Sequence, residues 1–566
     1  MSKQKKINDP IHGAMEFSDL EIELINTKPF QRLRNIGQLA FVSHVFPSAT
    51  YTRFAHSLGV CHVTGLIIGA MIDAAPDGAI KEHLISKRAV YRIAALLHDI
   101  GHYPYSHVTE HAERTARDEA SEEMLNASER IRGEAGTDQR SAPRKSIHPI
   151  NHERLGREIL LNDPEIKAIL AREGLDPHQI AFIFNGGSSI TAQEDSDFLM
   201  HFPYFAIVSS DVDADRIDYL LRNSYFSGLP YGSIDNKYLV RQFLIVDDDE
   251  IAIDIRALHA VDHFLISRYY DYAQFIFHKT STGFEKMLQS IISYLSQTEK
   301  IQLKYHSAGI EDFIKNYWLS FDDAAMITHI RETLDRTSHS EEMSLENYEL
   351  RRVRHYANSL LWRKPSKILV NYQFLGNRKQ AGKGQPDSLD RRAYVLIVRS
   401  LEQALIQASN FFVEQGKFVY LFIWNSDRPH FTSPAIEYPS STDRPTKQKA
   451  VKIRNNGNGR SALLTSYANS LSQLIDSKCL FTIRAYATSD EVELEGDTLF
   501  ELSATVKKNF IKNLADNIEL DKPQINEVYV KDGDDDNSFT TLEEAIKRIE
   551  DLADQISFLD PPETSD

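Results

Sequence analysis

Cysteine is almost absent from this sequence, which contains only Cys61 and Cys479 in 566 residues. Two cysteines so far apart can form neither a disulfide framework nor a Cys-x-x-Cys zinc site, so any metal must be bound by histidine and carboxylate side chains. Long apolar runs are also missing: no stretch approaches twenty apolar residues, and the opening MSKQKKINDP has no apolar signal core. These absences predict a cytoplasmic protein that does not span a membrane.

An excess of positive charge is missing as well, because the formal net charge is −17 at pH 7. Long duplex nucleic acid is therefore an unfavourable default substrate. A small anionic substrate is compatible with this charge if lysines and arginines gather around one site. The composition is otherwise that of an ordinary globular protein, with 42% hydrophobic and 26% charged residues, and the length predicts two or three domains.

The first two thirds of the chain have mainly helical patterning. Residues 1–110 predict one dense helical unit, and the charged stretch after it predicts an exposed helix and then a mobile insertion at about 111–147. Further helices are predicted from His152-Glu153 through Leu160, over 210–228 and over 257–300. The glycine-rich GNRKQAGKGQP (376–386) predicts a flexible junction, so we expect a helical core domain over 1–375.

The patterning changes after this junction. AYVLIVRS (393–400) and KFVYLFIW (417–424) have strand-like composition and flank a helix near 401–415, which predicts a β-α-β unit. The remaining predicted elements are a polar segment at 425–460, then a helix, a strand at 479–487 and a helix near 497–517. No internal repeat is present. We expect residues 390–566 to form a smaller α+β domain that regulates or assembles the core.

An acidic run near the end of the chain has the spacing of a calcium loop. Asp532, Asp534, Asp536 and Glu543 fall at ligand positions, but Asn537 replaces the required glycine. The preceding QINEVYV (524–530) has the pattern of a strand rather than of a helix. We therefore interpret the run as a solvated acidic turn before a helix over 540–557.

The stretch AVYRIAALLHDIGHYPYSH (89–107) is the strongest candidate for chemistry. Its apolar residues predict a buried helix, which a glycine and a proline then end. His98 and Asp99 lie side by side where the apolar run ends, and His102 follows one turn later on the same face. An imidazole beside a carboxylate suits a first-row divalent metal. A His-Asp pair alone is expected about once by chance in a chain of this length, so other segments must support the interpretation.

Several scattered motifs supply that support. In chain order they are INDPIHG (7–13), FQRLRNIGQL (30–39), VFP (45–47), RFAHSLGV (53–60), LLHDIGHYPYSH (96–107), HE (152–153), DVDADRIDY (211–219) and HK (278–279). In the first of them, Asp9 and His12 are expected to cap and pin the N-terminal segment. Together the motifs resemble those of the HD-domain phosphohydrolases, and within them the dNTP triphosphohydrolases of the branch with the animal SAM-and-HD-domain enzyme. This resemblance covers about half of the chain and implies a mostly α-helical HD core.

The resemblance assigns a role to each matching residue. The metal ligands would be His56, His98, Asp99 and Asp215. This set leaves positions open for water and a phosphate oxygen, as catalytic metals require. His102, His107 and His152 would act at the scissile phosphate, with Glu110, in place of the animal enzyme's aspartate, orienting the histidines.

The remaining roles concern substrate. Arg53, Arg216 (in place of a lysine) and Arg268 would bind the triphosphate, while Gln38, Leu39, Tyr219 and His278 would complete the substrate site. Gln38 would bond the 3′-hydroxyl of the sugar, Leu39 would leave no room for a 2′-hydroxyl, and Tyr219 would pack beneath the deoxyribose. Asn223 replaces an aspartate that also touches the sugar, which would weaken this discrimination.

An activating nucleotide is implied at a subunit interface. The matching positions are Asn8, Asn26, Gln31, Arg34 and Lys279. Asn26 stands where the animal enzyme has a guanine-reading aspartate, and an amide both donates and accepts whereas a carboxylate only accepts. We therefore expect a nucleotide site that is not tuned to guanine.

The resemblance implies a metal-dependent triphosphohydrolase that converts a dNTP and water into a deoxynucleoside and triphosphate. The cofactor would be a divalent ion (Mn, Fe, Mg, Zn or Ni), and the protein would work as a homo-oligomer, whether dimer, tetramer or hexamer. A role in depleting dNTPs during phage infection, as antiviral defence, follows only by analogy. Two alternatives stay open: a phosphodiesterase or nuclease that uses the same metal site, and a non-catalytic nucleotide sensor.

Overall fold

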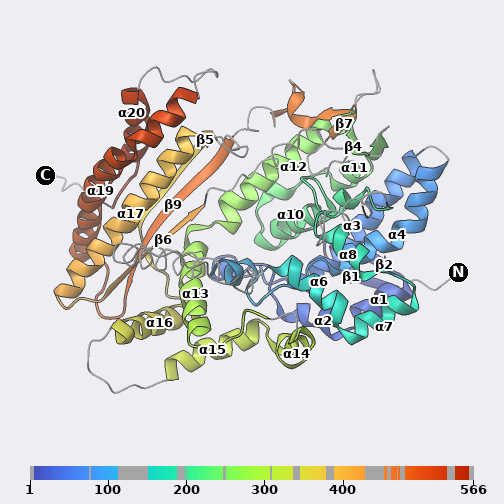
Figure 1. Cartoon of the computed structure of the whole chain (residues 1–566), viewed down its shortest axis with the longest axis horizontal. Helices are drawn as coiled ribbons and strands as arrows, with labels where there is room; N and C mark the ends of the chain where they lie inside the picture. The colour runs from blue at the N-terminus through green and yellow to red at the C-terminus, as the bar shows by residue number, and fades with distance from the viewer. Residues whose placement is uncertain are drawn as a thin grey trace, which may run out of the picture. The chain divides into compact units, whose positions relative to one another are not determined.

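The computed structural model describes residues 5–75, 78–112, 151–187, 198, 201–246, 250–305, 309–335, 345–377, 388–426, 452–454, 461–467, 469–471, 478–531 and 542–559. The chain forms two compact units, each built from separate stretches (Figure 1). The first comprises Met1–Asp271, Leu288–His339 and Ala435–Ser466, and the second comprises Tyr272–Met287, Ser340–Pro434 and Tyr467–Asp566. Most of the predicted insertion and junction, and the acidic turn before α20, lie outside the described residues.

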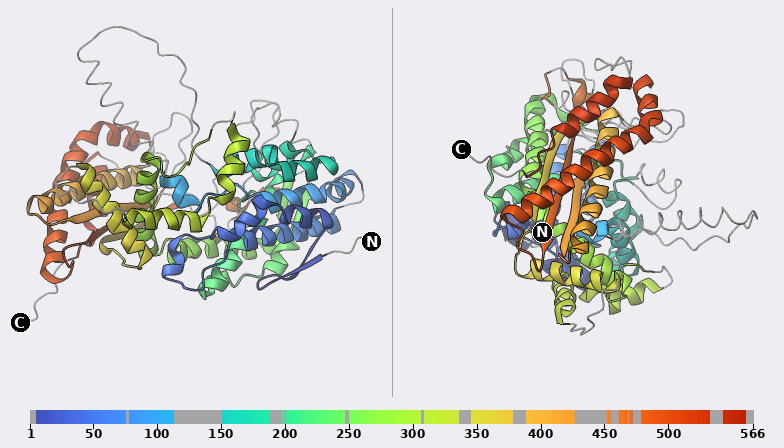
Figure 2. Two further views of the ribbon diagram at one scale, coloured as in Figure 1. Left: turned by 90° about the horizontal axis from the view of Figure 1, so that it is seen from below. Right: turned by 90° about the vertical axis from the view of Figure 1, so that its left-hand side faces the viewer.

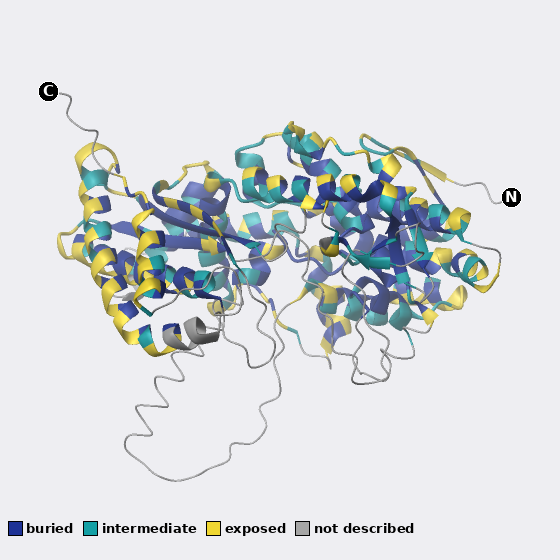
Figure 3. Cartoon of the chain, turned by 90° about the horizontal axis from the view of Figure 1, so that it is seen from above, coloured by how far each residue is buried: buried dark blue, intermediate teal, exposed yellow. Residues whose placement is uncertain are grey.

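The first unit is mostly helical, as expected. Its helices are α1 (Asp19–Ile25), α2 (Lys28–Arg32), α3 (Arg53–Ala74), α4 (Ala79–Leu97), α6 (His152–Asn162), α7 (Pro164–Arg172), α8 (Pro177–Phe184), α10 (Ala214–Ser227), α11 (Asn236–Val240), α12 (Leu258–Tyr270), α14 (Ile310–Asn316) and α15 (Asp323–Asp335). Helix α13 (Lys279–Gln297) begins in the second unit and ends in the first. The core lies where α3 packs against α4 and α10, and buried side chains fill this interior (Figure 3).

Helix α3 is long and apolar enough to cross a membrane, with a mean hydropathy of 1.6 over its best window. Of that window, 67% is buried inside the unit, which is how a core helix of a globular protein behaves. Among the described residues it is the one helix with this length and composition.

Two small sheets belong to the first unit. Strands β1 (Lys5–Asp9) and β2 (Gly13–Phe17) form an antiparallel hairpin. Strands β3 (Phe243–Val246), β4 (Glu250–Asp254), β7 (Lys452–Arg454) and β8 (Ser461–Leu463) form a four-stranded sheet in this order. The chain thus returns some two hundred residues later to pair β7 parallel to β4, with Ile253 opposite Ile453.

The second unit is a three-stranded antiparallel sheet with helices. Its elements are α16 (Leu345–Leu361), β5 (Lys367–Asn377), α17 (Leu389–Glu414), β6 (Val419–Ser426), β9 (Lys478–Ser489), α19 (Gly496–Lys531) and α20 (Leu542–Asp554). Strand β9 lies between β5 and β6, and α17 and α19 run side by side over the sheet (Figures 1 and 2). Because side chains alternate along a strand, Phe481, Ile483 and Ala485 face the helix-packed core, whereas Arg484 and Tyr486 face the start of α13.

Two strand predictions in this unit are wrong. Residues 393–400 lie inside α17, where Ala393, Leu396, Ile397 and Leu401 are buried at helical spacing against the sheet. Residues 524–530 lie inside α19, where Leu514, Ile518 and Ile525 continue one buried stripe past Pro523. In both cases packing of one face decides the structure over β-branched composition.

The other predictions in this region fare better. The strands at 417–424 and 479–487 correspond to β6 and β9, and the predicted helix over 540–557 corresponds to α20. Residues 461–466 hold β8 and a 3-10 turn, and Leu471 is helical. Residues 472–477, where the rest of the helix expected before β9 would lie, are outside the described residues.

Candidate metal centre and catalytic site

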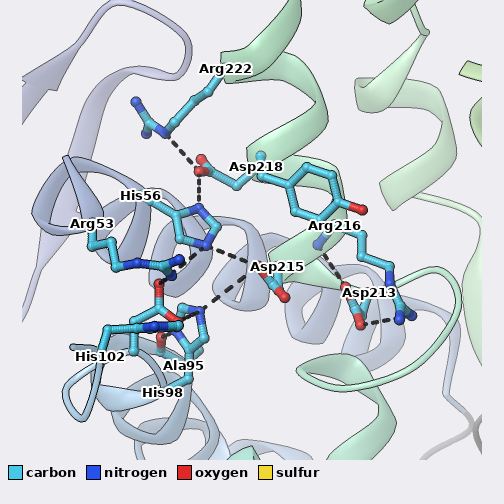
Figure 4. Close-up of polar contacts among 12 residues, drawn as sticks. Arg53, His56, Ala95, His98, His102, Asp213, Asp215, Arg216, Asp218 and Arg222 are labelled. Atoms are coloured by element: carbon cyan, nitrogen blue, oxygen red, sulfur yellow. Dashed lines mark hydrogen bonds and ion pairs between the residues drawn. The ribbon is translucent and has the colours of Figure 1, made fainter. Parts of the chain in front are cut away.

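Three helices of the first unit bring the predicted metal ligands together (Figure 4). His56 lies in the first turn of α3, His98 directly after α4, and Asp215 in the first turn of α10. The side chain of Asp213 caps α10 by accepting a hydrogen bond from the Arg216 amide at 2.7 Å, which fixes the start of the helix and so holds Asp215 in its first turn.

The prediction for the end of α4 needs a correction. The helix ends at Leu97 rather than near Gly101, so His98, Asp99 and His102 do not share a helical face. They lie in tight turns, where the Leu97 and Asp99 carbonyls accept hydrogen bonds from amides three residues later. Gly101 is required here because an added Cβ would lie 2.1 Å from the carbonyl oxygen of His152.

The ligand atoms of His56, His98 and Asp215 all lie within 4.8 Å of one another. The Asp215 Oδ1 atom is 2.9 Å from His56 Nε2 and 3.8 Å from His98 Nε2. Asp99 Oδ1 is 3.3 Å from His98 Nε2, and the other oxygen of Asp99 is 3.8 Å from His56 Nε2. His98 Nε2 is buried without a hydrogen-bond partner. A converging set of two imidazoles and two carboxylates with such an unused lone pair fits a first-row divalent ion.

A buried carboxylate that the sequence analysis gave no role orients His56. Asp218 Oδ2 lies 2.7 Å from His56 Nδ1, which leaves Nε2 turned toward Asp215. Asp218 also lies 2.6 Å from His12 Nε2 and accepts a hydrogen bond from Arg222 Nε at 2.6 Å. Burial opposes the ionisation of Asp218, but Arg222 and the two histidines hold the pKa of this carboxyl well below its usual range.

The N-terminal hairpin is tied into the same network. Asp9 Oδ1 accepts hydrogen bonds from the amides of Ile11 at 2.9 Å and His12 at 3.0 Å, and its Oδ2 accepts one from Arg222 at 2.8 Å. Asp9 and His12 therefore cap and pin this segment, as expected from the sequence. The four-residue spacing of Asp218 and Arg222 was the available sequence signal for the network that they join.

A second cluster lies beside the predicted metal ligands and contains the three histidines predicted to act at the scissile phosphate, His102, His107 and His152. Glu110 lies 2.7 Å from His152 Nδ1 and 3.0 Å from His107 Nδ1. The rings of His102 and His152 stack at 3.9 Å, and His102 Nε2 is 3.1 Å from Asp99 Oδ1. Burial and nearby Arg53 lower the pKa of His102. Burial also opposes the protonation of His152, but the hydrogen bond to Glu110 and the nearby carboxylate charges together raise the pKa of His152. An imidazole with a lowered pKa in contact with one whose pKa is raised suits a general base paired with a general acid.

Comparison with known proteins matches the part of the chain that carries all the histidines and carboxylates predicted for the two clusters except Asp215. The family model of the HD domain matches residues 53–169. The chain contains an HD domain. Burial of the Asp99 side chain opposes its ionisation, but Arg53, His98 and His102 hold the pKa of this HD-motif carboxyl well below its usual range, which favours its anionic form.

Relatives of the HD domain include proteins with and without a described activity. The chain is 30% identical over 298 residues to the uncharacterised protein YwfO of Bacillus subtilis, covering 52% of this chain and 57% of that protein. It is 33% identical over 256 residues to the deoxynucleoside triphosphate triphosphohydrolase SAMHD1 of Mus musculus, covering 42% of this chain and 33% of that protein. These alignments span about half or less of the curated relatives.

A solved structure supports the fold. A phosphohydrolase from Bacteroides thetaiotaomicron superposes with a TM-score of 0.55 over 86% of this chain and all of that chain, at 19% identity. At this identity the likeness concerns the fold alone.

The predicted phosphate-binding arginines lie around the HD centre. Arg53 is buried, and its guanidinium group donates hydrogen bonds to Asp99 Oδ2 at 2.6 Å and to Ser106 Oγ at 2.7 Å. Arg216 is partly exposed, 3.6 Å from Asp211 Oδ1. Arg268 donates to the Tyr219 hydroxyl at 3.2 Å, so the predicted sugar-packing ring and one arginine are in contact. Of the predicted sugar-reading pair, Leu39 is half-buried, and the buried Gln38 Oε1 has no hydrogen-bond partner.

The residues of the predicted activating site lie on several different elements. Asn8 and Asn26 are exposed on β1 and at the end of α1. Gln31 donates to the Ile25 carbonyl at 2.7 Å and accepts from Arg34 at 2.8 Å, and Arg34 also stacks on Phe54. Lys279 of this site and His278 of the predicted substrate site belong to the second unit. There the Tyr486 hydroxyl donates to the Lys279 carbonyl at 2.7 Å.

Asp271 gives the first unit a pH-dependent stability. It accepts hydrogen bonds from Tyr231 at 2.5 Å and Asn223 at 3.0 Å, and burial raises its pKa to about 7. The folded state therefore binds this proton more tightly than the unfolded chain, so stability falls as pH rises from about 4 through about 7. Between pH 5 and pH 8 the free energy of unfolding should fall by about 3 kcal/mol less in the Asp271→Asn variant than in the wild type, as measured by denaturant unfolding. An equal fall in wild type and variant would contradict this. The control is Asp19→Asn, because Asp19 is exposed, and it should follow the wild type.

Proposed function

We propose that this protein is a metal-dependent dNTP triphosphohydrolase, in which water attacks the α-phosphorus and the bond to the 5′-oxygen breaks. The products are a deoxynucleoside, whose 5′-oxygen takes up a proton, and inorganic triphosphate. The observation that carries the proposal is the convergence of His56, His98 and Asp215, with Asp99 close to both histidines, beside the His102–His152–Glu110 cluster. The alignment with the mouse triphosphohydrolase supports the substrate class.

The chain's own residues supply most of the required functions. His56, His98, Asp99 and Asp215 would hold a divalent ion, which when bound supplies Lewis-acid chemistry for phosphoryl transfer. His102, whose pKa is lowered, would accept a proton from the attacking water, and His152, whose pKa is raised beside Glu110, would donate one to the leaving oxygen. Arg216 and Arg268 would balance the triphosphate charge.

The test uses the full chain with Mn²⁺, Mg²⁺ or Fe²⁺, each dNTP alone and all four together, and ion-exchange separation of products. We expect equal amounts of deoxynucleoside and triphosphate. Activity that appears only in mixtures would support the activating nucleotide site. Release of monophosphate or diphosphate, or no turnover in any mixture, would defeat the proposal; cleavage of single-stranded DNA or cyclic nucleotides instead would favour a nuclease or phosphodiesterase. The assembly state and the cytoplasmic location stay predictions.

The unpartnered Gln38 Oε1 atom offers a sharper test of the sugar site. If it accepts the 3′-hydroxyl, the Gln38→Ala variant should lower kcat/KM for a dNTP about tenfold, because one substrate hydrogen bond is lost. The same variant should leave kcat/KM for a 2′,3′-dideoxynucleoside triphosphate unchanged, since that substrate lacks the group. A parallel loss on both substrates, measured by triphosphate release, would show that Gln38 acts only on the fold.

A further inference from the structure

The carboxylate of Asp323 joins two loops that are far from it in sequence. Asp323 begins α15. Its Oδ2 accepts a hydrogen bond from the Gly37 amide at 2.9 Å, and its Oδ1 accepts one from the Tyr105 amide at 2.8 Å. The first loop continues into Gln38 and Leu39, and the second is the turn from His102 to His107. One side chain therefore bridges the proposed sugar-reading loop and the proposed catalytic turn.

The same segment holds the catalytic turn at a second point. The buried Arg32 donates from Nη1 to the His102 carbonyl at 2.9 Å and from Nε to the Phe321 carbonyl at 3.1 Å. Its guanidinium group stacks 3.8 Å above the ring of Trp318. Residues 318–323 are thus linked to the turn twice. The Asp323 carboxylate binds it directly, and the Arg32 side chain bridges it to the Phe321 carbonyl.

The backbone of the catalytic turn needs such support. Tyr105 and Ser106 have φ angles of 54° and 53°, in the left-handed region that side chains with a Cβ rarely adopt. Strained backbone of this kind persists only where its surroundings hold it. The hydrogen bond from the Tyr105 amide to Asp323 is one of the interactions that hold it.

A carboxylate is the side chain that suits this task. It has two acceptor oxygens and no donor, so it can satisfy two N–H groups at once, whereas an asparagine of the same shape offers one acceptor and one NH₂ group. The NH₂ group would face one of the two amides. Burial raises the pKa of Asp323 to about 6, so the carboxylate form prevails at neutral pH.

We infer that Asp323 is a positioning residue that fixes the Gly37–Leu39 loop relative to the His102–His107 turn, and thereby sets the discrimination between deoxyribose and ribose substrates. This inference rests on the proposed function for its substrate. It adds a residue outside the recognised motifs and outside the residues that contact the reacting phosphate.

The neighbouring Asp322 provides a matched control. Its Oδ1 caps α15 by accepting a hydrogen bond from the Ala325 amide at 3.0 Å, and asparagine caps helices equally well. We expect the Asp323→Asn variant to lower the ratio of kcat/KM for dATP over ATP about tenfold, since one charged hydrogen bond to the loops is lost, with unchanged metal content. The Asp322→Asn variant should keep the wild-type ratio. An unchanged ratio in Asp323→Asn, or an equal fall in both variants, would overturn the inference.

Hydrogen exchange tests the two bonds without turnover. In the wild-type chain, the amides of Gly37 and Tyr105 should exchange more slowly than those of solvent-exposed loops. Exchange at the rate of unstructured peptide would overturn the inference. This measurement needs only the wild type, so it holds even if Asp323→Asn fails to fold. If the chain hydrolyses no nucleoside triphosphate, the proposed function fails. The exchange of these two amides still decides whether Asp323 holds the loops.

Discussion

The His98→Ala variant is expected to lose its bound divalent ion and to hydrolyse dNTPs at least about 10³-fold more slowly than the wild type. His98 Nε2 is buried without a hydrogen-bond partner and lies 3.3 Å from Asp99 Oδ1. Its removal takes away one of the four predicted ligands and leaves His56 as the only imidazole among them. A lost metal costs several kcal/mol of transition-state stabilisation, and each 1.4 kcal/mol is tenfold in rate.

Metal content by mass spectrometry and Mn²⁺ titration calorimetry measure this effect directly. The control is His259→Ala, because the His259 side chain is 77% exposed on α12 and takes no part in the centre. The control should bind one ion and turn over at the wild-type rate. If His98→Ala still bound an ion with wild-type affinity, the centre described here would not be the metal site.

Two glycines of α3 should respond in opposite directions to the same substitution. A Cβ added at Gly59 would lie 1.8 Å from Asp218 Oδ1 and 2.5 Å from the Arg222 guanidinium, so the buried carboxylate must move away from His56. We expect Gly59→Ala to lose about 2–3 kcal/mol of stability and to bind metal more weakly. A Cβ at Gly69 meets nothing within 4 Å, so Gly69→Ala should gain about 1 kcal/mol from helix propensity.

Thermal unfolding and metal titration of the two variants check this contrast. The pair shares a helix and a chemical change, so any difference comes from what surrounds each position. If Gly59→Ala were as stable as Gly69→Ala and retained its metal affinity, Asp218 would have no orienting role for His56.

Local patterns in the sequence were sufficient to predict the elements that carry the HD centre. The pattern over 210–228 predicts α10, and His152-Glu153 opens α6, as the structure has it. These segments have caps and apolar spacing of their own, so their structure depends little on distant contacts. The strand prediction at 393–400 failed because its composition is strand-like, while the sheet that buries one face of α17 is built from strands elsewhere in the chain.

Long-range polar contacts could not be predicted in this way. Asp323 reaches the Gly37 amide across 286 positions and the Tyr105 amide across 218, and no local pattern distinguishes it from its neighbour Asp322. Asp218 lay inside a quoted motif but had no role until its distance to His56 was known. Such residues are found from geometry, because their partners are backbone groups or side chains that no spacing rule relates to them.

The pairing of β7 with β4 has a consequence for biosynthesis. The β3–β4 hairpin is translated early, yet its neighbours β7 and β8 emerge only after α17 and β6 have been made. Until then the outer edge of β4 presents unpaired amide and carbonyl groups to any passing strand, which is the usual route to aggregation. A fragment that stops at residue 375 would keep this edge open permanently. Production of the catalytic unit for the experiments above therefore calls for the whole chain, and its folding is expected to finish after translation rather than during it.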